Sequence, residues 1–180
     1  MLKPTLSIGI AVSALALSNT PAVAQDLQLA APDQNNPQID YRGFAQLTDE
    51  LWSYRADRLI DLDQFNALSN TGNALILDTR SAAAFAQGHI EGAINLPFSD
   101  FTEEKLAFYL SDKSRPILIY CNNNFRDNVA PVVRKAAPLA LNIPTFINLY
   151  GYGYENIYEL RDVVTMADPR VRWVGSEHTG

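Results

Sequence analysis

The sequence predicts an α/β fold, a parallel sheet with helices on both faces. Short apolar runs alternate with segments of helical spacing, and the links between them are short. Residues 74–77 and 117–120 are apolar throughout, which is typical of strands that are buried on both faces. The chain of 180 residues is long enough for one domain with a substantial core.

Residues 1–24 have the pattern of an export signal. Lys3 precedes an apolar run over residues 6–17, and Ala22-Val23-Ala24 fits an A-x-A cleavage site. The run is too short to span a membrane, so we expect no membrane anchor. Cleavage after Ala24 predicts a periplasmic or secreted protein. The polar residues 25–40 are expected to form a flexible leader.

Residues 41–57 predict an added helix before the alternating part of the chain. Apolar side chains recur there at helical spacing and define one face: Phe44, Leu47, Leu51 and Tyr54. Trp52 is expected to widen this face. We expect the helix to cover part of the core, and its residues indicate no chemistry.

The alternating part extends over residues 58–165. The expected strands are 58–60, 74–77, 93–96, 117–120 and 145–149. The expected helices are 62–68, 81–86, 100–110, 127–137 and 155–164. Asp61 and Gln64 form a predicted capping box for the first of these helices. The tail, residues 166–180, is expected to lay Val171 and Trp173 on the domain as an extended segment.

Cys121 is the only cysteine, and it directly follows the predicted strand 117–120. The carboxyl ends of parallel strands are where α/β sheets bind ligands. Loop amides and the amino end of a helix over residues 127–137 would stabilise a thiolate and any anion brought to it. A single cysteine forms no internal disulfide, so we expect a reactive free thiol rather than pairing with another chain.

The residues after the cysteine predict a tight loop. Asparagine tolerates positive φ better than other non-glycine residues, and three asparagines follow Cys121 in a row. Arg126 ends the loop, where it would either bind the oxyanions of a substrate at two points or form a surface ion pair with Asp127. The charge of Asp127 is expected to oppose a low pKa of the Cys121 thiol.

Four motifs resemble those of the rhodanese family of sulfurtransferases, and they occur in the family's order. They are Asp78-Thr79-Arg80 after a strand, the sequence GHIEGAINLP at residues 88–97, the cysteine loop at 121–126, and Gly151-Tyr152-Gly153. The resemblance implies a rhodanese-like sheet in the alternating part, with the helix at 41–57 as an addition. It also implies that the glycine turn follows the last strand.

The resemblance further implies an enzyme that moves a sulfane sulfur. Cys121 would take sulfur from thiosulfate or a polysulfide, hold it as a persulfide, and pass it to cyanide or a thiol, including a thiol on a protein acceptor. No cofactor is implied. The residues expected to bind the donor are Asn122, Asn123, Asn124, Phe125 and Arg126. The supporting residues, mainly structural in the family, are Asp78, Arg80 and His89.

Two other functions remain open. Asn124 stands where the family often has glycine, and with Asp127 it favours a non-catalytic relative that holds or senses sulfur. A cysteine-dependent phosphatase ranks last, because four residues separate Cys121 from Arg126 rather than five.

The net charge disfavours two classes of partner, and the histidines argue against a metal site. The formal net charge is -6, and it becomes -7 when Lys3 leaves with the signal, which disfavours nucleic acid and anionic membranes. The two histidines, His89 and His178, lack ligand spacing to Cys121, so we expect no metal site.

Overall fold

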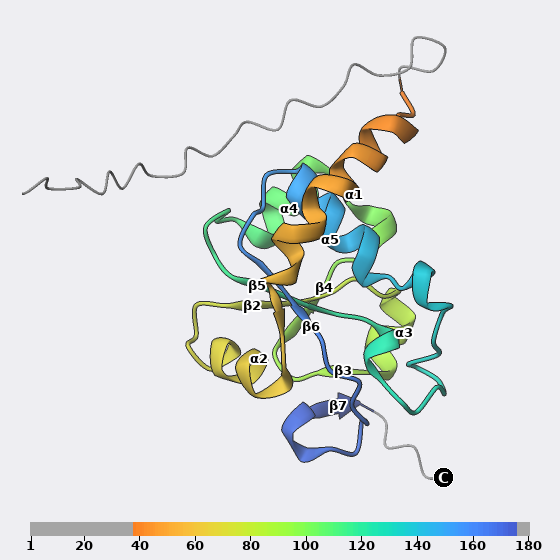
Figure 1. The fold of residues 1–180 in the computed structure, drawn as a ribbon. Helices are drawn as coiled ribbons and strands as arrows, with labels where there is room; N and C mark the ends of the chain where they lie inside the picture. Colours follow the sequence, from red (N-terminus) through yellow and green to blue (C-terminus); the bar gives the residue numbers. More distant parts are fainter. Residues whose placement is uncertain (1–37, 176–180) are drawn as a thin grey trace, which may run out of the picture.

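The computed structural model describes residues 38–175 of the chain (Figure 1). The expected export signal at residues 1–24, the leader up to residue 37 and the tail from residue 176 onward lie outside the described residues. None of the helices within residues 38–175 combines the length and the apolar character that crossing a membrane requires.

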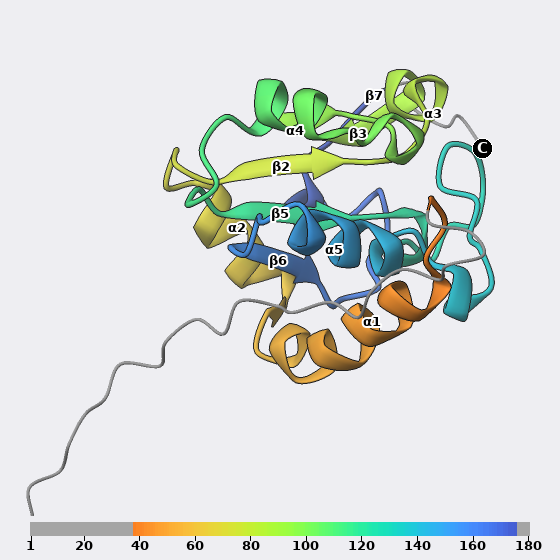
Figure 2. The same cartoon turned by 90° about the horizontal axis from the view of Figure 1, so that it is seen from above.

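Within the described range, five strands form one parallel sheet, which confirms the predicted α/β class. The strands are β1 (Leu59–Ile60), β2 (Leu75–Asp78), β4 (Ala93–Asn95), β5 (Ile117–Tyr120) and β6 (Ile157–Leu160). Their order across the sheet is β1-β6-β5-β2-β4, so β5 lies in the middle between β6 and β2 (Figure 2). Every residue of β2 and β5 is buried, because layers of structure cover both faces of the sheet.

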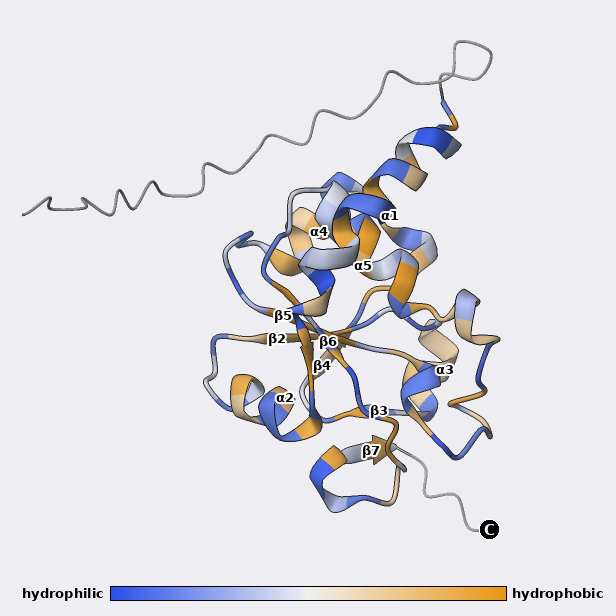
Figure 3. Cartoon of the chain, in the orientation of Figure 1, coloured by the Kyte–Doolittle hydropathy of each residue, from blue (hydrophilic) through white to orange (hydrophobic). Residues whose placement is uncertain are grey.

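Three helices cover one face of the sheet: α1 (Tyr41–Ala56), α4 (Glu103–Leu110) and α5 (Asn142–Gly151) (Figure 1). Their buried side chains pack on the odd-numbered residues of β2 and β5, such as Leu77 and Ile119. The hydrophobic residues concentrate in the sheet and in the helix faces turned toward it (Figure 3). This packing provides one of the two hydrophobic cores in the described range.

The other face packs against α2 (Leu62–Ser69) and a two-stranded antiparallel ribbon. The ribbon pairs β3 (Gly88–Ile90) with β7 (Trp173–Gly175). Val171 is fully buried there and Trp173 packs against the same core, so the predicted packing of these two residues is confirmed; the extended conformation is wrong for Val171, which ends the 3-10 helix Pro169–Val171. The short α3 (Ala82–Gln87) leads directly into β3.

Local capping explains where several helices begin. Asp61 and Gln64 form the predicted capping box at α2. The Ser81 side chain accepts a hydrogen bond from the Ala84 amide and starts α3. α4 is capped by Thr102, rather than starting at Asp100 as predicted. The 3-10 helices are η1 (Phe98–Asp100), η2 (Asn122–Asn124), η3 (Ala137–Leu139) and η4 (Pro169–Val171).

Three predicted elements are wrong, and one cause explains them. Residues 127–137 form no α-helix; they are mainly irregular chain leading into η3. The predicted strand 145–149 belongs to α5, and the predicted helix 155–164 contains β6 instead. The first α-helix after Cys121 begins at Asn142 rather than at residue 127, and the elements after it are displaced accordingly. The Gly151-Tyr152-Gly153 turn therefore follows a helix, not the last strand.

The spacing of the buried residues shows why α5 is a helix. Asn142, Thr145, Phe146 and Leu149 are buried at intervals of three and four residues, which is one face of a helix. Pro144 lies in the first turn, where proline leaves no hydrogen bond unmade. In α1, Leu51 is buried as predicted, but Trp52 is 78% exposed, so the expectation that it widens the apolar face is wrong.

Candidate functional site

Cys121 directly follows β5, at the carboxyl edge of the sheet. Side chains alternate between the two faces of a strand, and Ile117 and Ile119 pack in the core under α1, α4 and α5. Cys121 continues this alternation toward α5, and its exposed fraction is only 1%. The predicted thiol therefore lies at the expected edge of the sheet but is closed off from solvent.

The surroundings of the thiol act on its pKa in opposite directions. Burial, the largest effect, raises the pKa of Cys121, and the negative charge of Glu159 raises it further. Backbone N–H groups of Asn142, Asn123 and Leu141 hydrogen-bond the sulfur and lower the pKa. The net result is a pKa above the ordinary value of a thiol.

A helix amino end does approach the sulfur, but it is not the predicted one. The amides of Leu141 and Asn142 belong to the start of α5, whereas the sequence predicted a helix start at residue 127. The cradle is therefore built from two separate stretches of chain: η2, which follows the cysteine, and the first turn of α5, some twenty positions later. A helix amino end in this place favours an anion at the sulfur.

Asn122 and Asn123 hold the chain between η2 and α5. The Asn122 amide donates to the Val133 carbonyl at 2.8 Å. The Asn123 side chain donates to the Lys135 carbonyl at 2.8 Å and accepts from the Lys135 N–H at 3.1 Å. Their predicted positive φ is wrong, since η2 has ordinary helical geometry. Among the asparagines in the described range, Asn128 is the one with positive φ, at 49°.

Asn124 is a buried connector. Its Oδ1 accepts hydrogen bonds from the Cys121 N–H at 2.9 Å and from Asn142 Nδ2 at 3.1 Å. Its Nδ2 donates to the carbonyls of Leu160 at 2.7 Å and Asp162 at 3.1 Å. The residue that stands in place of the family's glycine thus ties the end of β5 to α5 and to the end of β6. A backbone with glycine here would lack these side-chain contacts.

Asn142, Glu159 and Arg55 extend this network, and sequence reasoning missed all three. Asn142 Nδ2 also donates to Glu159 Oε1 at 3.3 Å. Arg55 donates two hydrogen bonds to the Glu159 carboxylate, from Nε to Oε2 at 2.6 Å and from Nη2 to Oε1 at 2.7 Å. The available signal was a glutamate inside the apolar stretch Ile157–Leu160, since a charge in a buried strand requires a partner.

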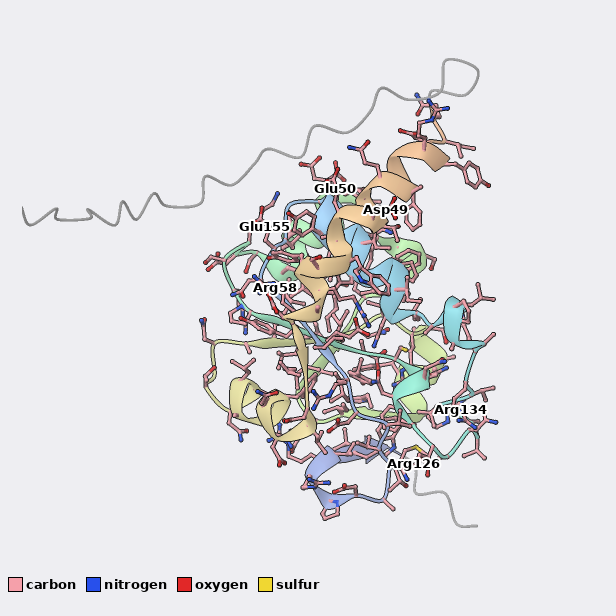
Figure 4. All side chains as sticks on the ribbon, in the orientation of Figure 1. Asp49, Glu50, Arg58, Arg126, Arg134 and Glu155 are labelled. Atoms are coloured by element: carbon pink, nitrogen blue, oxygen red, sulfur yellow. The ribbon has the colours of Figure 1, made fainter. Side chains whose placement is uncertain are left out.

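Phe125 and Arg126 do not line the thiol. Phe125 is fully buried and packs edge-on against Tyr120 and Trp173 on the opposite face of the sheet. Arg126 is exposed, and its Nε donates to the Val163 carbonyl at 3.0 Å. Figure 4 shows Arg126 and Arg134 on the segment that follows β5. The expected two-point contact of Arg126 with a donor therefore has no support in this arrangement.

Asp127 is also turned away from its expected partners. Its carboxylate accepts hydrogen bonds from Thr165 Oγ1 and the Met166 N–H, each at 3.0 Å. The ion pair with Arg126 considered from the sequence is not among the salt bridges of the described residues. The acidic residue that raises the Cys121 pKa is Glu159, on the neighbouring strand.

Asp78 and Arg80 form a buried ion pair at the end of β2. Arg80 Nη2 contacts Asp78 Oδ2 at 2.5 Å and also donates to the Gly88 carbonyl at 2.7 Å. The Tyr120 hydroxyl donates to Asp78 Oδ2 at 2.5 Å. Burial, together with the charge of Asp78, raises the pKa of Tyr120 well above its ordinary range. This cluster connects β2, β3 and β5 beneath the site.

His89 contributes to the same support. Its Nδ1 lies 2.9 Å from the Phe85 carbonyl, and its ring stacks on Phe85 with the centroids 3.7 Å apart. Both contacts fix the turn between α3 and β3. No group of three or more potential metal-ligating side chains occurs within residues 38–175.

The comparisons identify the family. The model of the rhodanese-like domain matches residues 61–162, more than half of the chain, and the protein belongs to this family. Two solved structures are similar at 18% identity. The BH2092 protein from Bacillus halodurans has a TM-score of 0.43, with 62% of this chain and 72% of that chain covered. The Alr3790 protein from Anabaena sp. has a TM-score of 0.42, with 64% and 91% covered. None of the curated proteins matches the chain.

Proposed function

We propose that this protein is an exported sulfurtransferase that carries a sulfane sulfur on Cys121. The observation that supports the proposal most directly is the convergence of three backbone N–H groups on the thiol sulfur, from Asn123, Leu141 and Asn142. Such a cradle stabilises negative charge on a thiolate or a persulfide in the way an oxyanion hole does. The pattern of residues 1–24 supports export to the periplasm or beyond.

The reaction has two displacement steps. The Cys121 thiolate attacks the outer sulfur of thiosulfate, a new S–S bond forms, and sulfite leaves with the electron pair of the broken S–S bond. The carbon of cyanide, or the sulfur of an acceptor thiolate, then attacks the terminal sulfur of the persulfide. That S–S bond breaks, the acceptor leaves with the sulfur, and the Cys121 thiolate is restored. A polysulfide donor reacts in the same way, with a shortened polysulfide as leaving group.

Basic residues on the segment between η2 and α5 (residues 125–141) support an anionic donor. Arg126, Arg134 and Lys135 are exposed, and none of them forms a salt bridge within the described residues. On a chain of net charge -6, Arg134 and Lys135 supply positive charge on the stretch that Asn122 and Asn123 bind, next to the cysteine loop. Such positive charge raises the rate at which anions arrive. Because Cys121 is 1% exposed, turnover requires a local movement that opens the site around the sulfur.

A second candidate is a module that holds sulfur without passing it on. The enclosed thiol and its raised pKa favour this function, because the protonated thiol is a poor nucleophile. A phosphatase has less support. Its phosphate loop would need an arginine over the thiol, whereas the Arg126 guanidinium is bound to the Val163 carbonyl.

Intact mass measures sulfur uptake directly. The purified protein incubated with thiosulfate or a polysulfide is expected to gain the mass of one sulfur atom, and Cys121→Ser is expected to gain none. Added cyanide should remove the extra mass and release thiocyanate. A stable extra sulfur that neither cyanide nor excess thiol removes would favour the holding module. Absence of uptake from every sulfane donor would overturn the proposal.

A further inference from the structure

The helix α1 lies outside the stretch that matches the family model, yet it reaches the thiol site. The match covers residues 61–162, and α1 ends at Ala56. Arg55, in the last turn of α1, has a side chain that is 35% exposed, and it binds Glu159, whose side chain is 7% exposed. The pair therefore runs from the edge of the protein into the layer between α1, α5 and the sheet.

A continuous set of hydrogen bonds connects this ion pair to Cys121. Glu159 accepts from Asn142 Nδ2, and the same nitrogen donates to Asn124 Oδ1. Asn124 Oδ1 in turn accepts from the Cys121 N–H. Asn142 touches the site twice, because its own backbone N–H is one of the three that hydrogen-bond the sulfur. Each of the connecting side chains is buried, so water does not screen them.

Strand geometry brings Glu159 to the thiol. Glu159 lies opposite Ile119 in the parallel pairing of β5 with β6, and Cys121 comes two residues after Ile119. Residues two apart on a strand share a face, so the carboxylate and the thiol lie on the same side of the sheet. The charge of a buried carboxylate in this position opposes the formation of a thiolate.

We infer that Arg55 and Glu159 are positioning residues that set the charge balance of Cys121, with the added helix α1 supplying the compensating cation. The Arg55 guanidinium binds both oxygens of the Glu159 carboxylate and offsets its negative charge. Asn142 hydrogen-bonds both Glu159 and Asn124 and so fixes the carboxylate relative to the cysteine loop. The inference rests on the proposed function only in taking Cys121 as the working thiol.

The other charged groups near the site point elsewhere. The Asp162 carboxylate accepts from the Leu62 N–H and lies near Arg161, and only its backbone carbonyl reaches Asn124. Asp127 is bound by Thr165 and Met166. The hydrogen bond to Glu159 raises the pKa of Arg55, so Arg55 stays charged wherever a thiol titrates.

The test is a direct titration of the single thiol, without any sulfur donor. Protein labelled with ¹³C at the cysteine Cβ gives one resonance, because Cys121 is the only cysteine, and its shift against pH reports the pKa. Glu159→Gln is expected to lower the Cys121 pKa, since it removes the negative charge and leaves Arg55. Arg55→Met is expected to raise it. Each shift should be on the order of one pKa unit, the size that a nearby charge produces.

Two further variants distinguish a charge effect from a loss of structure. Arg42→Met removes an exposed arginine from the first turn of the same helix and is expected to leave the Cys121 pKa unchanged. Arg55→Lys keeps the charge and should return the pKa most of the way to that of the wild type. Shifts of the same sign in Glu159→Gln and Arg55→Met, or an equal shift in Arg42→Met, would overturn the inference.

Glu159→Gln, in which the side chain keeps its shape, makes the test decisive even if Arg55→Met does not fold. In that case an unchanged or raised pKa in Glu159→Gln is sufficient to reject the inference. Sulfur uptake measured by mass on the same samples is independent of this outcome. If the wild type takes up no sulfur, but the Cys121 pKa falls in Glu159→Gln and rises in Arg55→Met as expected, only the proposed function is rejected.

Discussion

A single residue, Asn124, determines how the chain leaves β5. Glycine at this position would rely on backbone freedom, whereas here an amide side chain makes four hydrogen bonds to four different residues. The backbone of Cys121 is therefore fixed by a side-chain acceptor three residues away. The sulfur keeps its place even though the segment that follows is irregular.

Removing this side chain should be costly. Asn124→Ala leaves the Cys121 N–H and the carbonyls of Leu160 and Asp162 without their partner, and each buried unpaired group costs about 1–3 kcal/mol. Because neighbouring losses overlap, we expect the free energy of unfolding in urea to fall by about 3 kcal/mol. Asn156→Ala, which removes one exposed hydrogen bond to the Ser114 carbonyl, is the control and should lose about 1 kcal/mol or less. Equal losses would mean that the buried network adds no stability.

The sequence predicted the position of Cys121 but not the orientation of the residues after Phe125. Four apolar residues before the cysteine sufficed to indicate a buried strand and its end. The chain then continues as a bridge in which Phe125 pairs with Val164, and strand alternation turns Arg126 outward. A pairing between segments almost forty residues apart leaves no local pattern in the sequence. Arg55 was missed for the same reason, because its partner Glu159 lies 104 residues later in the chain.

Among the elements, the β3–β7 ribbon explains the glycine of the GHI sequence. A Cβ added to Gly88 would lie 2.6 Å from Trp173 Nε1 and 2.7 Å from two other atoms of that ring. Trp173 also lies against Phe125 and over Arg80, so it has little room to move. The glycine is thus required by close contact between two strands, while the backbone of Gly88 is extended.

Gly88→Ala is therefore expected to destabilise the protein by about 1–3 kcal/mol, the usual effect of overpacking. Gly151→Ala is a matched control, because its Cβ would meet Leu47 Cδ1 at an ordinary 3.7 Å. We expect the control to change stability by less than about 0.5 kcal/mol. Thermal and urea unfolding measure both, and a neutral Gly88→Ala would show that β7 detaches at little cost.

Local signals predicted the elements before Cys121 far better than those after it. α2 begins at the predicted Asp61–Gln64 box, and α3 begins within one residue of its predicted start at residue 81; both starts lie in short connections. Between η2 and α5 the chain is held by tertiary contacts, such as Val132 in the core and the carbonyls bound by Asn122 and Asn123. Such contacts have no periodicity, so the sequence offered nothing to locate the start of α5.

At the scale of the whole molecule, the enclosed thiol connects stability to pH. Burial raises the pKa of Cys121 in the folded protein above the value of about 8.5 expected for an unfolded chain. Below that value both states keep the proton and the thiol has no effect on the pH dependence. Above it the unfolded chain loses its proton first, so stability falls as the pH rises toward the folded pKa.

The wild type should lose more stability than Cys121→Ser between about pH 8 and about pH 10. Burial also raises the pKa of Tyr120. Because Tyr120 is present in both proteins, its contribution to the pH dependence of stability cancels in the comparison. Urea unfolding at a series of pH values measures how steeply the free energy of unfolding falls with pH in each of the two proteins. Parallel slopes would mean that the thiol ionises as readily in the folded protein as in the unfolded chain.

The hydrogen bonds from Asn122 to Val133 and from Asn123 to Lys135 divide the segment between η2 and α5 (residues 125–141) into two parts. We expect changes of length or charge at residues 129–130 and 136–140, on either side of these fixed points, to leave the sulfur and the backbone N–H of Asn123 in place. Substitutions on either side of the fixed points can therefore alter the surface beside Cys121 while the sulfur stays where it is.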